Sequence, residues 1–530
     1  MGAEPTDFGA TDFGARDFGA TDFGATLTIA APLAIEAAAL RRGTAARPTT
    51  RVVRVGVGPR RAGDAAARLS AEARTSGRPV VHVVAGVAGA LVADLSPGDL
   101  VVADRVLSSN GAPVRELPGA ALLAAMLGRH GLRVRVGPVI SVDHLVRGVA
   151  ARRNLAAFGA LVVDMESAAL AAGMPQGPFA VVRAVVDTPG QELFSPSTLG
   201  GGIAALRSLR SARPALESWA AAAAPRRVLL AEPRSFCAGV ERAIHTVERA
   251  IDRFGAPVYV RRQIVHNRHV VNDLEGRGAV FVEELGQVPE GATVVYSAHG
   301  VGRAVQTEAA RRNLHVIDAT CPLVAKVHSE VRRFTARGRQ VVLVGHPGHD
   351  EVLGTLDQAD EVLLAERPED VPGLEVRDPS RLAYTTQTTL SPADVEGVVE
   401  ALRARWPDIV GPAAADICYA THNRQAAVEA IACASDLVLV VGSANSSNSH
   451  RLVEVAARRG TRAELIDDVT DLDPAWLTGV HSVGVTAGAS APDSLVSELV
   501  ESLVALGATE VETSTATTES VAFSLPPEVR

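Results

Sequence analysis

Short apolar runs alternate with longer amphipathic stretches along most of the chain. The runs have strand length, as at residues 27–31, 80–85, 179–186, 315–317, 340–344 and 437–441. Stretches of helix length separate them, and several of these begin just after a Gly-rich or Pro-containing turn. Such alternation predicts an α/β fold class with largely parallel sheets.

The pattern changes at two points and indicates three segments. Residues 1–25 repeat Thr-Asp-Phe-Gly-Ala with small variations. Such units cannot bury a core, so they predict a disordered tail, with a partner-binding repeat as the alternative. Residues 26–225 form one α/β series, which ends in a Gly-, Ser- and Pro-rich loop at 190–202 and an Ala-rich helix. A second series predicts another domain at residues 226–530.

Composition narrows the class of protein. The chain has 530 residues, 47% of them hydrophobic, and a net charge of −8 without a basic stretch interleaved with aromatics, so a nucleic-acid partner is not expected. It has no apolar run of the roughly 18–20 residues that a membrane span needs and no secretory signal pattern, so no membrane partner is expected. Four cysteines do not make a secreted disulfide framework. We therefore expect a cytoplasmic protein.

Three of the four cysteines follow a predicted strand and precede a predicted helix: Cys237, Cys321 and Cys418. Thiolates at strand ends suit zinc or an iron–sulfur cluster. Single cysteines far apart fit a cluster between subdomains better than a zinc site built from close pairs, and three ligands leave one iron open for a substrate. The alternative is three small buried side chains. Cys433 lies in an apolar helical stretch and is predicted to belong to a core.

Polar turns follow many strands of the second half. Their His, Ser, Thr and Asn side chains include His266, His299, His349, Thr388, Ser446, Ser447, Asn448 and Ser490. Strand ends of parallel sheets share one edge, and these groups with free backbone N–H suit a diphosphate. For any one histidine alone, an ordinary hydrogen-bonded turn is the alternative. Glu351 lies among them, and the pKa of a carboxyl beside an anion should rise, which suits a proton donor. A helix N-terminal carboxylate is the alternative.

Taken together, these motifs in residues 228–527 resemble the hydroxymethylbutenyl diphosphate reductase family, LytB/IspH. The matching stretches are PRSFCAGVERAI, VHNRHVV, SAHGV, DATCPLVAKVH, GHPGHDEVLGT, TQTTLS, DICYATHNRQ, VGSANSSNSHRL and GVTAGASAPD. The resemblance implies a trefoil of three α/β subdomains around one [4Fe–4S] cluster per chain, held by Cys237, Cys321 and Cys418. Two residues depart from the family pattern: Ser235 replaces a usual Gly, and Asp350 replaces a usual Pro beside Glu351.

The resemblance also implies an activity. The family removes the hydroxyl of (E)-4-hydroxy-3-methylbut-2-enyl diphosphate with two electrons and two protons, giving isopentenyl and dimethylallyl diphosphates in the last step of the non-mevalonate isoprenoid pathway. Ferredoxin or flavodoxin is the implied electron donor. Glu351 matches the proton donor, and His349 and Thr388 match residues around the hydroxyl. The diphosphate ligands match His266, His299, Ser446, Asn448 and Ser490, with Ser447 beside them. The alternative is a cluster- or zinc-carrying diphosphate sensor without turnover.

The first half is similar to the purine/uridine phosphorylase and nucleosidase family over residues 27–225. Gly-rich turns follow two of its strands, at residues 56–58 and 86–89. The resemblance implies that Met165 and Glu166 contact a ribose, that Asp187 protonates a purine and that Glu36 activates water. Val87 replaces a hydroxyl that many relatives carry, which counts against phosphorolysis. A nucleosidase, a phosphorylase and a non-catalytic nucleoside-binding domain all stay open.

Overall fold

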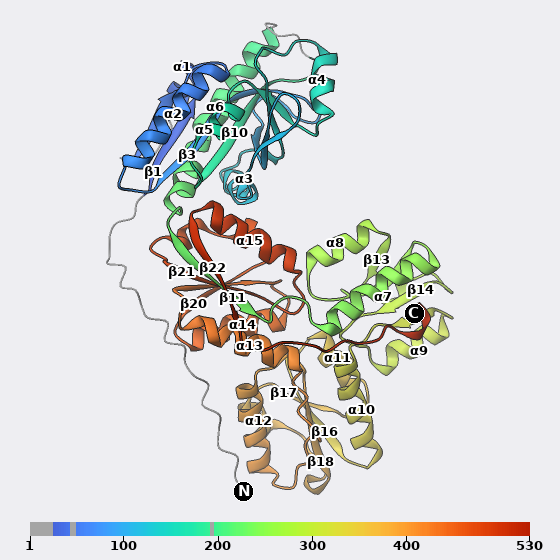
Figure 1. Cartoon of the computed structure of the whole chain (residues 1–530). Coiled ribbons are helices and arrows are strands. Elements are labelled where there is room, and N and C mark those ends of the chain that lie inside the picture. The colour runs from blue at the N-terminus through green and yellow to red at the C-terminus, as the bar shows by residue number, and fades with distance from the viewer. Residues whose placement is uncertain (1–24, 43–48, 191–195) are drawn as a thin grey trace. The chain divides into compact units, whose positions relative to one another are not determined.

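The computed structural model describes residues 25–42, 49–190 and 196–530, so the repeat tail lies outside it apart from its last residue. The chain divides into two compact units (Figure 1). Unit 1 comprises Met1–Arg226, Asp473–His481 and Val504–Thr509. Unit 2 comprises Arg227–Leu472, Ser482–Leu503 and Glu510–Arg530.

Unit 1 is built on a 10-stranded sheet in the order β6-β5-β8-β9-β3-β10-β4-β7, to which β1 attaches through β3 and β2 through β1. Its strands are β1 Thr26–Ala31, β2 Thr50–Arg54, β3 Val80–Ala90, β4 Leu100–Val102, β5 Arg105–Leu107, β6 Pro113–Glu116, β7 Val134–Val136, β8 Val139–Ser141, β9 Val162–Asp164 and β10 Phe179–Asp187. Its helices are α1 Ala34–Arg41, α2 Pro59–Thr75, α3 Ala120–Arg129, α4 Val149–Ala156, α5 Ser167–Gly173 and α6 Pro196–Ala221. The α/β fold predicted for this half is confirmed.

One detail of unit 1 differs from the sequence-based prediction. The loop predicted at 190–202 overlaps α6, which already begins at Pro196. The chain changes partners between β4 and β5, so that β4 pairs with β10 and β5 with β8.

Unit 2 contains three separate sheets, with the orders β20-β19-β21-β11-β22, β13-β12-β14-β15 and β17-β16-β18. Its strands are β11 Arg226–Glu232, β12 Val258–Arg261, β13 Ala279–Val282, β14 Thr293–Tyr296, β15 His315–Asp318, β16 Gln340–Val344, β17 Leu363–Ala365, β18 Leu382–Thr386, β19 Leu437–Val441, β20 Arg462–Ile466, β21 Ser482–Ala487 and β22 Ala508–Thr515. The three predicted α/β subdomains are therefore present, and they form separate lobes in Figure 1.

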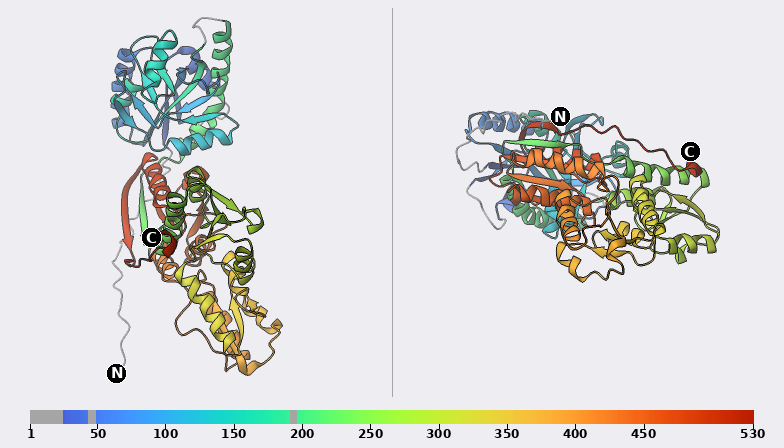
Figure 2. Two further views of the ribbon diagram at one scale, coloured as in Figure 1. Left: turned by 90° about the vertical axis from the view of Figure 1, so that its right-hand side faces the viewer. Right: turned by 90° about the horizontal axis from the view of Figure 1, so that it is seen from below.

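Helices cover each of these sheets. They are α7 Ala238–Phe254, α8 Arg268–Gly276, α9 Arg303–Arg311, α10 Pro322–Ala336, α11 Asp350–Leu356, α12 Pro392–Arg405, α13 Tyr419–Ala432, α14 Ser447–Arg458 and α15 Asp493–Ala505. Short 3-10 helices lie at η1 Leu285–Gln287, η2 Pro368–Gly373, η3 Pro379–Arg381, η4 Val469–Asp471, η5 Pro474–Leu477 and η6 Pro527–Val529. In the sheet around β19, α15 lies on one face and α13 and α14 on the other (Figures 1 and 2).

The strand pairings at the centre of each sheet are parallel, for example β12 with β14, β16 with β18 and β19 with β21. Parallel strands place their carboxyl ends at one edge, where the following helices begin. The central strands are buried along their whole length, as in β16 and β19. Each sheet thus offers one edge of helix N-termini, and the polar turns noted in the sequence lie there. Within the described residues no helix is long and apolar enough to cross a membrane.

Candidate active site

Each of the three turn cysteines caps the N-terminus of a helix in unit 2. Cys237 precedes α7, Cys321 precedes α10 and Cys418 precedes α13. All three line one cavity of about 110 Å³. A helix N-terminus favours negative charge, so three helix N-termini beside one cavity suit thiolates.

The sulfurs are close to one another and are not in disulfides. A Cβ placed on Gly239 would lie 2.6 Å from the Sγ of Cys321 and 3.8 Å from the Sγ of Cys237, so a single glycine touches both sulfurs. Burial, together with the neighbouring thiols, raises the pKa of Cys321 to about 12 and that of Cys418 to about 11. Thiols in such a place ionise only if a cation replaces their protons. The donor set therefore fits a metal centre with thiolate ligands.

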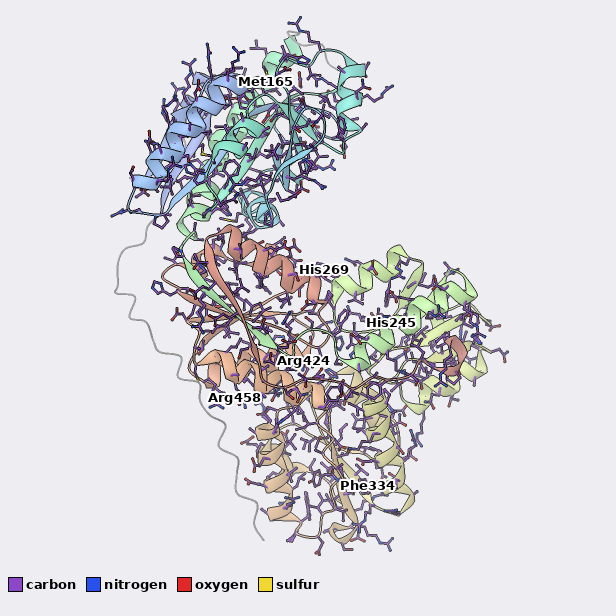
Figure 3. The ribbon with its side chains drawn as sticks, in the orientation of Figure 1. Met165, His245, His269, Phe334, Arg424 and Arg458 are labelled. Atoms are coloured by element: carbon purple, nitrogen blue, oxygen red, sulfur yellow. The ribbon has the colours of Figure 1, made fainter. Side chains whose placement is uncertain are left out.

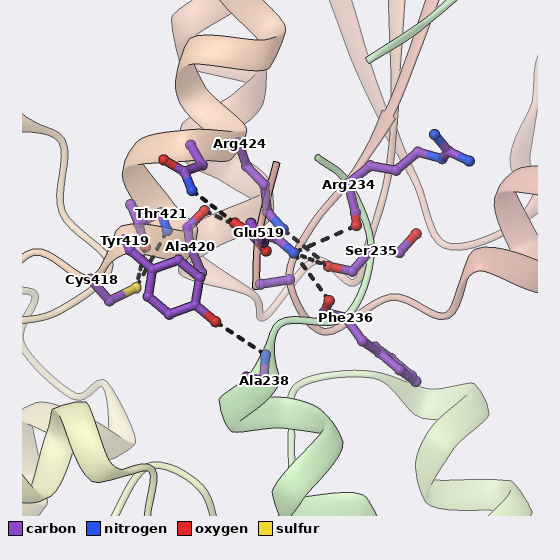
Figure 4. Close-up of polar contacts among 12 residues, drawn as sticks. Arg234, Ser235, Phe236, Ala238, Cys418, Tyr419, Ala420, Thr421, Arg424 and Glu519 are labelled. Carbon is purple, nitrogen blue, oxygen red and sulfur yellow. Dashed lines mark hydrogen bonds and ion pairs between the residues drawn. The ribbon is translucent and has the colours of Figure 1, made fainter. Parts of the chain in front are cut away.

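The buried side chain of Arg424, on α13, connects the segment before Cys237 to the helix after Cys418 (Figure 4). Its Nε and Nη2 donate to the carbonyl oxygen of Ser235 at 3.0 and 2.8 Å. Its Nη1 pairs with Glu519 at 3.0 Å. The guanidinium fork thereby fixes two cysteine-bearing turns relative to each other.

Three histidines from two subdomains meet at another side of the same cavity. The rings of His266 and His299 stack with centroids 4.1 Å apart, and His349 contacts them edge-on at 5.4 and 5.8 Å. Burial lowers the pKa of all three, to about 4 for His349. The lowered pKa values favour neutral imidazoles, and a bound anion would favour their protonation.

Hydroxyl and amide groups from the third subdomain complete this side. Ser446 caps α14, Asn448 accepts a hydrogen bond from the backbone N of Ala489 at 2.9 Å, and Ser490 donates to the carbonyl of His266 at 3.1 Å. Several buried polar atoms have no hydrogen-bond partner within the described residues: His266 Nε2, His299 Nδ1 and Asn448 Nδ2. Buried polar groups are normally satisfied, so these atoms indicate a missing polar ligand.

Glu351 lies at the start of α11 and lines the same cavity as the histidines and the cysteines. Its Oε1 accepts from the backbone N of Thr388 at 2.7 Å, and its Oε2 accepts from the Thr388 hydroxyl at 2.8 Å. Burial raises the pKa of Glu351 to about 7, although both Thr388 hydrogen bonds act in the opposite direction. A carboxyl with such a pKa can hold a proton near neutral pH and release it. The neighbouring Asp350 pairs instead with Arg262.

The structure thus brings all twelve residues predicted for this half to one cavity: Cys237, Cys321, Cys418, Glu351, His266, His299, His349, Thr388, Ser446, Ser447, Asn448 and Ser490. The prediction for Cys433 was wrong. Cys433 was predicted to belong to a core, but α13 ends at Ala432, and Cys433 follows as its exposed C-cap.

Unit 1 has a cavity of its own, of about 200 Å³, lined by all four residues predicted there: Glu36, Met165, Glu166 and Asp187. Glu36 accepts from the backbone N of Leu33 at 2.6 Å and of Val87 at 2.8 Å. Figure 3 labels Met165 among the side chains of unit 1 and Arg424 among those of unit 2.

Two arginines that the sequence did not single out pair with the acidic groups of this cavity. Arg152 contacts both carboxylate oxygens of Asp187, at 3.1 and 2.7 Å. Arg183 lies 2.5 Å from Asp164 and 3.8 Å from Glu166. All of these side chains are buried. The cavity wall is therefore a network of paired charges.

Comparison with known proteins places the second half in a family. The family model described as LytB protein matches residues 228–504. The chain belongs to the LytB family. The 4-hydroxy-3-methylbut-2-enyl diphosphate reductase of Bordetella pertussis is 60% identical over 305 residues, covering 57% of this chain and 94% of that protein. Its counterpart in Marinobacter nauticus is 56% identical over 308 residues, covering 57% and 98%.

A solved structure agrees with this assignment. The E-1-hydroxy-2-methyl-but-2-enyl-4-diphosphate reductase from Plasmodium falciparum is similar to this LytB chain with a TM-score of 0.56 and 37% sequence identity, covering 58% of this chain and 97% of that chain. A second family model, described as Phosphorylase superfamily, matches residues 9–198. The resemblances drawn from the sequence of each half are confirmed.

Several residues that shape the LytB cavity were missed from the sequence. Gly239 and Tyr419 were not singled out, although Gly239 is two residues after Cys237, Tyr419 directly follows Cys418, and both line the cavity. Phe523 also lines it, from the tail after the last strand. Adjacency to a cysteine was a usable signal for the first two. No local signal connects Phe523 with the cavity.

Proposed function

We propose that the LytB half is a reductase that removes the hydroxyl of (E)-4-hydroxy-3-methylbut-2-enyl diphosphate and yields isopentenyl and dimethylallyl diphosphates. The main support for this proposal is that one cavity is lined by three cysteines, a buried carboxyl and several polar side chains with unpaired atoms. Relatives that bear the name of this reductase match nearly their whole length. The net reaction takes two electrons and two protons and releases water.

Cys237, Cys321 and Cys418 would hold an iron–sulfur cluster, expected to be a single [4Fe–4S] centre. Three cysteines that are outside disulfides and line one cavity support this assignment. When bound, the cluster supplies the electrons of the reaction. A reducing cytoplasm and a ferredoxin or flavodoxin as electron donor suit such a centre.

The protein's own groups bind and protonate the substrate. His266, His299, Ser446, Asn448 and Ser490 would bind the diphosphate, with Ser447 beside them. Their unpaired polar atoms gain partners when phosphate oxygens enter, and charge-assisted hydrogen bonds are among the stronger ones.

In this proposal the hydroxyl end of the substrate, opposite the diphosphate, lies against His349, Thr388 and Glu351. His349 and Thr388 would surround the hydroxyl, and the Glu351 carboxyl would supply a proton from its oxygen. The pKa of Glu351, about 7, lets the group hold that proton before the reaction. The Glu351 side chain is buried, which limits its exchange of that proton with bulk water.

The test is anaerobic turnover of the diphosphate by the full chain, with reduced methyl viologen as donor and chromatography of the products. Glu351→Gln keeps the shape but holds no transferable proton, so its rate should fall by at least about 100-fold. Glu308→Gln, at an exposed carboxylate paired with Arg311, is the matched control and should retain the wild-type rate. A metal-loaded wild-type chain that binds the diphosphate without turnover would refute the reductase and favour a sensor.

We also propose that the cavity of unit 1 takes a nucleoside. The Phosphorylase superfamily match and the placement of Glu36, Met165, Glu166 and Asp187 around one cavity support this. Carboxylates suit the hydroxyls of a sugar, and the Met165 side chain offers an apolar contact. Calorimetry with adenosine, inosine and uridine tests the proposal, and absence of binding by all three would refute it.

A further inference from the structure

The C-terminal segment, residues 516–526, connects two subdomains of unit 2 without forming a helix or a strand. It leads from β22 to η6, and Figure 1 shows it as a dark red trace that runs toward the C-terminus. At its start the backbone N of Ala516 donates to the carbonyl of Glu232 at 2.8 Å. At its far end Leu525 packs against the apolar core that contains residues of α7 and α8, where Val529 is also buried. Both ends of the segment are therefore fixed.

Arg242 connects this segment to the turns of two cysteines. It lies on α7, the helix that Cys237 precedes. Its Nε donates to the carbonyl of Ser524 at 2.8 Å, and its Nη1 donates to the carbonyl of Thr320 at 3.0 Å. Thr320 directly precedes Cys321 in the chain. One guanidinium therefore joins the C-terminal segment to the backbone beside both cysteines.

Arg424 makes a matching contact near the third cysteine (Figure 4). It lies on α13, the helix that Cys418 precedes, and its Nη1 pairs with Glu519 at 3.0 Å. The Nδ2 of Asn423 donates to the same carboxylate oxygen at 3.1 Å. The Arg424 side chain is fully buried, and breaking a buried ion pair leaves an uncompensated charge. The segment is thus held beside all three cysteine turns.

Phe523 lies between these two anchor points and lines the cavity of the three cysteines. Its neighbour Ser524 is the residue that Arg242 holds, so the Phe523 ring closes the cavity at its cysteine end. Phe523 is half-buried, whereas Val521, two residues earlier, is 43% exposed. Apolar side chains around a metal site control the access of solvent to the metal.

We propose that the C-terminal segment forms the outer wall of the metal site and that Phe523 shields the metal centre from water and dioxygen. The inference rests on the proposed metal centre. Truncation of the ring to a methyl group opens space for a water molecule, which needs only about 30 Å³. Dioxygen that enters takes an electron from the reduced centre and becomes superoxide, and the oxidised centre then releases iron.

The experiment moves the anaerobically purified, iron-loaded full chain into air-saturated buffer and follows iron release with a colorimetric chelator. Phe523→Leu, Phe523→Val and Phe523→Ala remove progressively more of the side chain, so iron release should become faster in that order. Phe523→Ala should release iron about tenfold faster than the wild type, the lower end of what changes around a metal site cost. Val521→Ala, at an exposed position of the same segment, is the matched control and should release iron at the wild-type rate.

The iron content before exposure to air separates shielding from assembly of the centre. Each Phe523 variant should carry as much iron as the wild type under anaerobic conditions. Equal release rates in air across the series would overturn the inference, and so would iron already missing before exposure in a variant with wild-type circular dichroism. If Phe523→Ala does not fold, the order of Phe523→Leu and Phe523→Val decides. A wild-type chain without iron would overturn the proposed metal centre, and the inference with it.

Discussion

The protonation of Glu351 gives the sharpest test of how the LytB cavity works, and Thr388→Val perturbs it in a known direction. The Thr388 hydroxyl donates to Glu351 Oε2 at 2.8 Å and stabilises the ionised carboxylate. Valine has the same shape but no hydroxyl, and the backbone hydrogen bond to Oε1 remains. The variant should therefore raise the pKa of Glu351 above its wild-type value of about 7.

The size of the shift follows from the hydrogen bond that is lost. A hydrogen bond to a charged group contributes about 1.5–3 kcal/mol, and one pKa unit corresponds to about 1.4 kcal/mol, so a rise of about one to two units is expected. A proton donor works only when protonated. Activity is therefore present below the pKa of Glu351 and is lost as the pH rises through it.

The assay is kcat/KM against pH, measured anaerobically with reduced methyl viologen. The alkaline limb should move upward by about one to two pH units in Thr388→Val. The absolute rate should also fall, because Thr388 is proposed to contact the substrate, but the position of the limb is the readout. Thr335→Val is the matched control, since that hydroxyl donates to the carbonyl of Val331 within α10. A limb that stays in place or moves downward would refute Glu351 as the acid.

Three further substitutions test the cavity walls. Gly239→Ala should lose most of its bound iron while keeping its circular dichroism, because the new Cβ would lie 2.6 Å from the Cys321 sulfur. Arg424→Lys should lower both iron retention and Tm, because one ammonium cannot replace the guanidinium fork and each buried carbonyl left unpaired costs about 1–3 kcal/mol. Asp350→Asn breaks the ion pair beside the active carboxyl, worth about 1 kcal/mol, and should lower kcat/KM roughly fivefold without loss of iron.

Each of these three substitutions has an outcome that would contradict its prediction, and the glycine substitution has a matched control. Gly276→Ala, where an added Cβ meets no atom within 4 Å, should keep its iron. Full iron loading of Gly239→Ala would mean that the cysteines do not converge as described. An unchanged Tm in Arg424→Lys would show that the fork does not hold the cysteine turns. Iron loss in Asp350→Asn would assign Asp350 to folding instead of positioning.

Much of the LytB site could be predicted because its residues lie where parallel strands end. The turns at His266 and His299 follow strands of one parallel sheet, and the turn at Thr388 follows a strand of another. In each sheet the carboxyl ends of the strands share one edge, which makes the polar character of these turns informative. Strand β16 illustrates why, since all five of its residues are buried and the polar turn His346–Glu351 comes soon after it. The cysteine positions carried the same signal, and the structure brings all three to one cavity.

Other features depend on contacts between distant segments. Arg424 reaches Ser235 across almost two hundred residues of sequence, and nothing near either residue indicates that contact. Arg152 and Asp187 meet in the same way in unit 1. Cys433 shows the opposite failure, because an apolar neighbourhood suggested burial at a position where the helix had already ended. Ser235, at a usual Gly position, has φ 59°, which explains why glycine suits that turn.

The most direct test of the central claim is iron and acid-labile sulfide analysis of the anaerobically purified chain, compared with Cys→Ser variants at Cys237, Cys321 and Cys418. The account predicts about four iron and four sulfide per chain in the wild type and loss of most of both in each variant. Cys433→Ser, at an exposed cysteine outside the cavity, should match the wild type. Zinc in place of iron, or full iron in any of the three variants, would contradict the cluster and with it the proposed reductase.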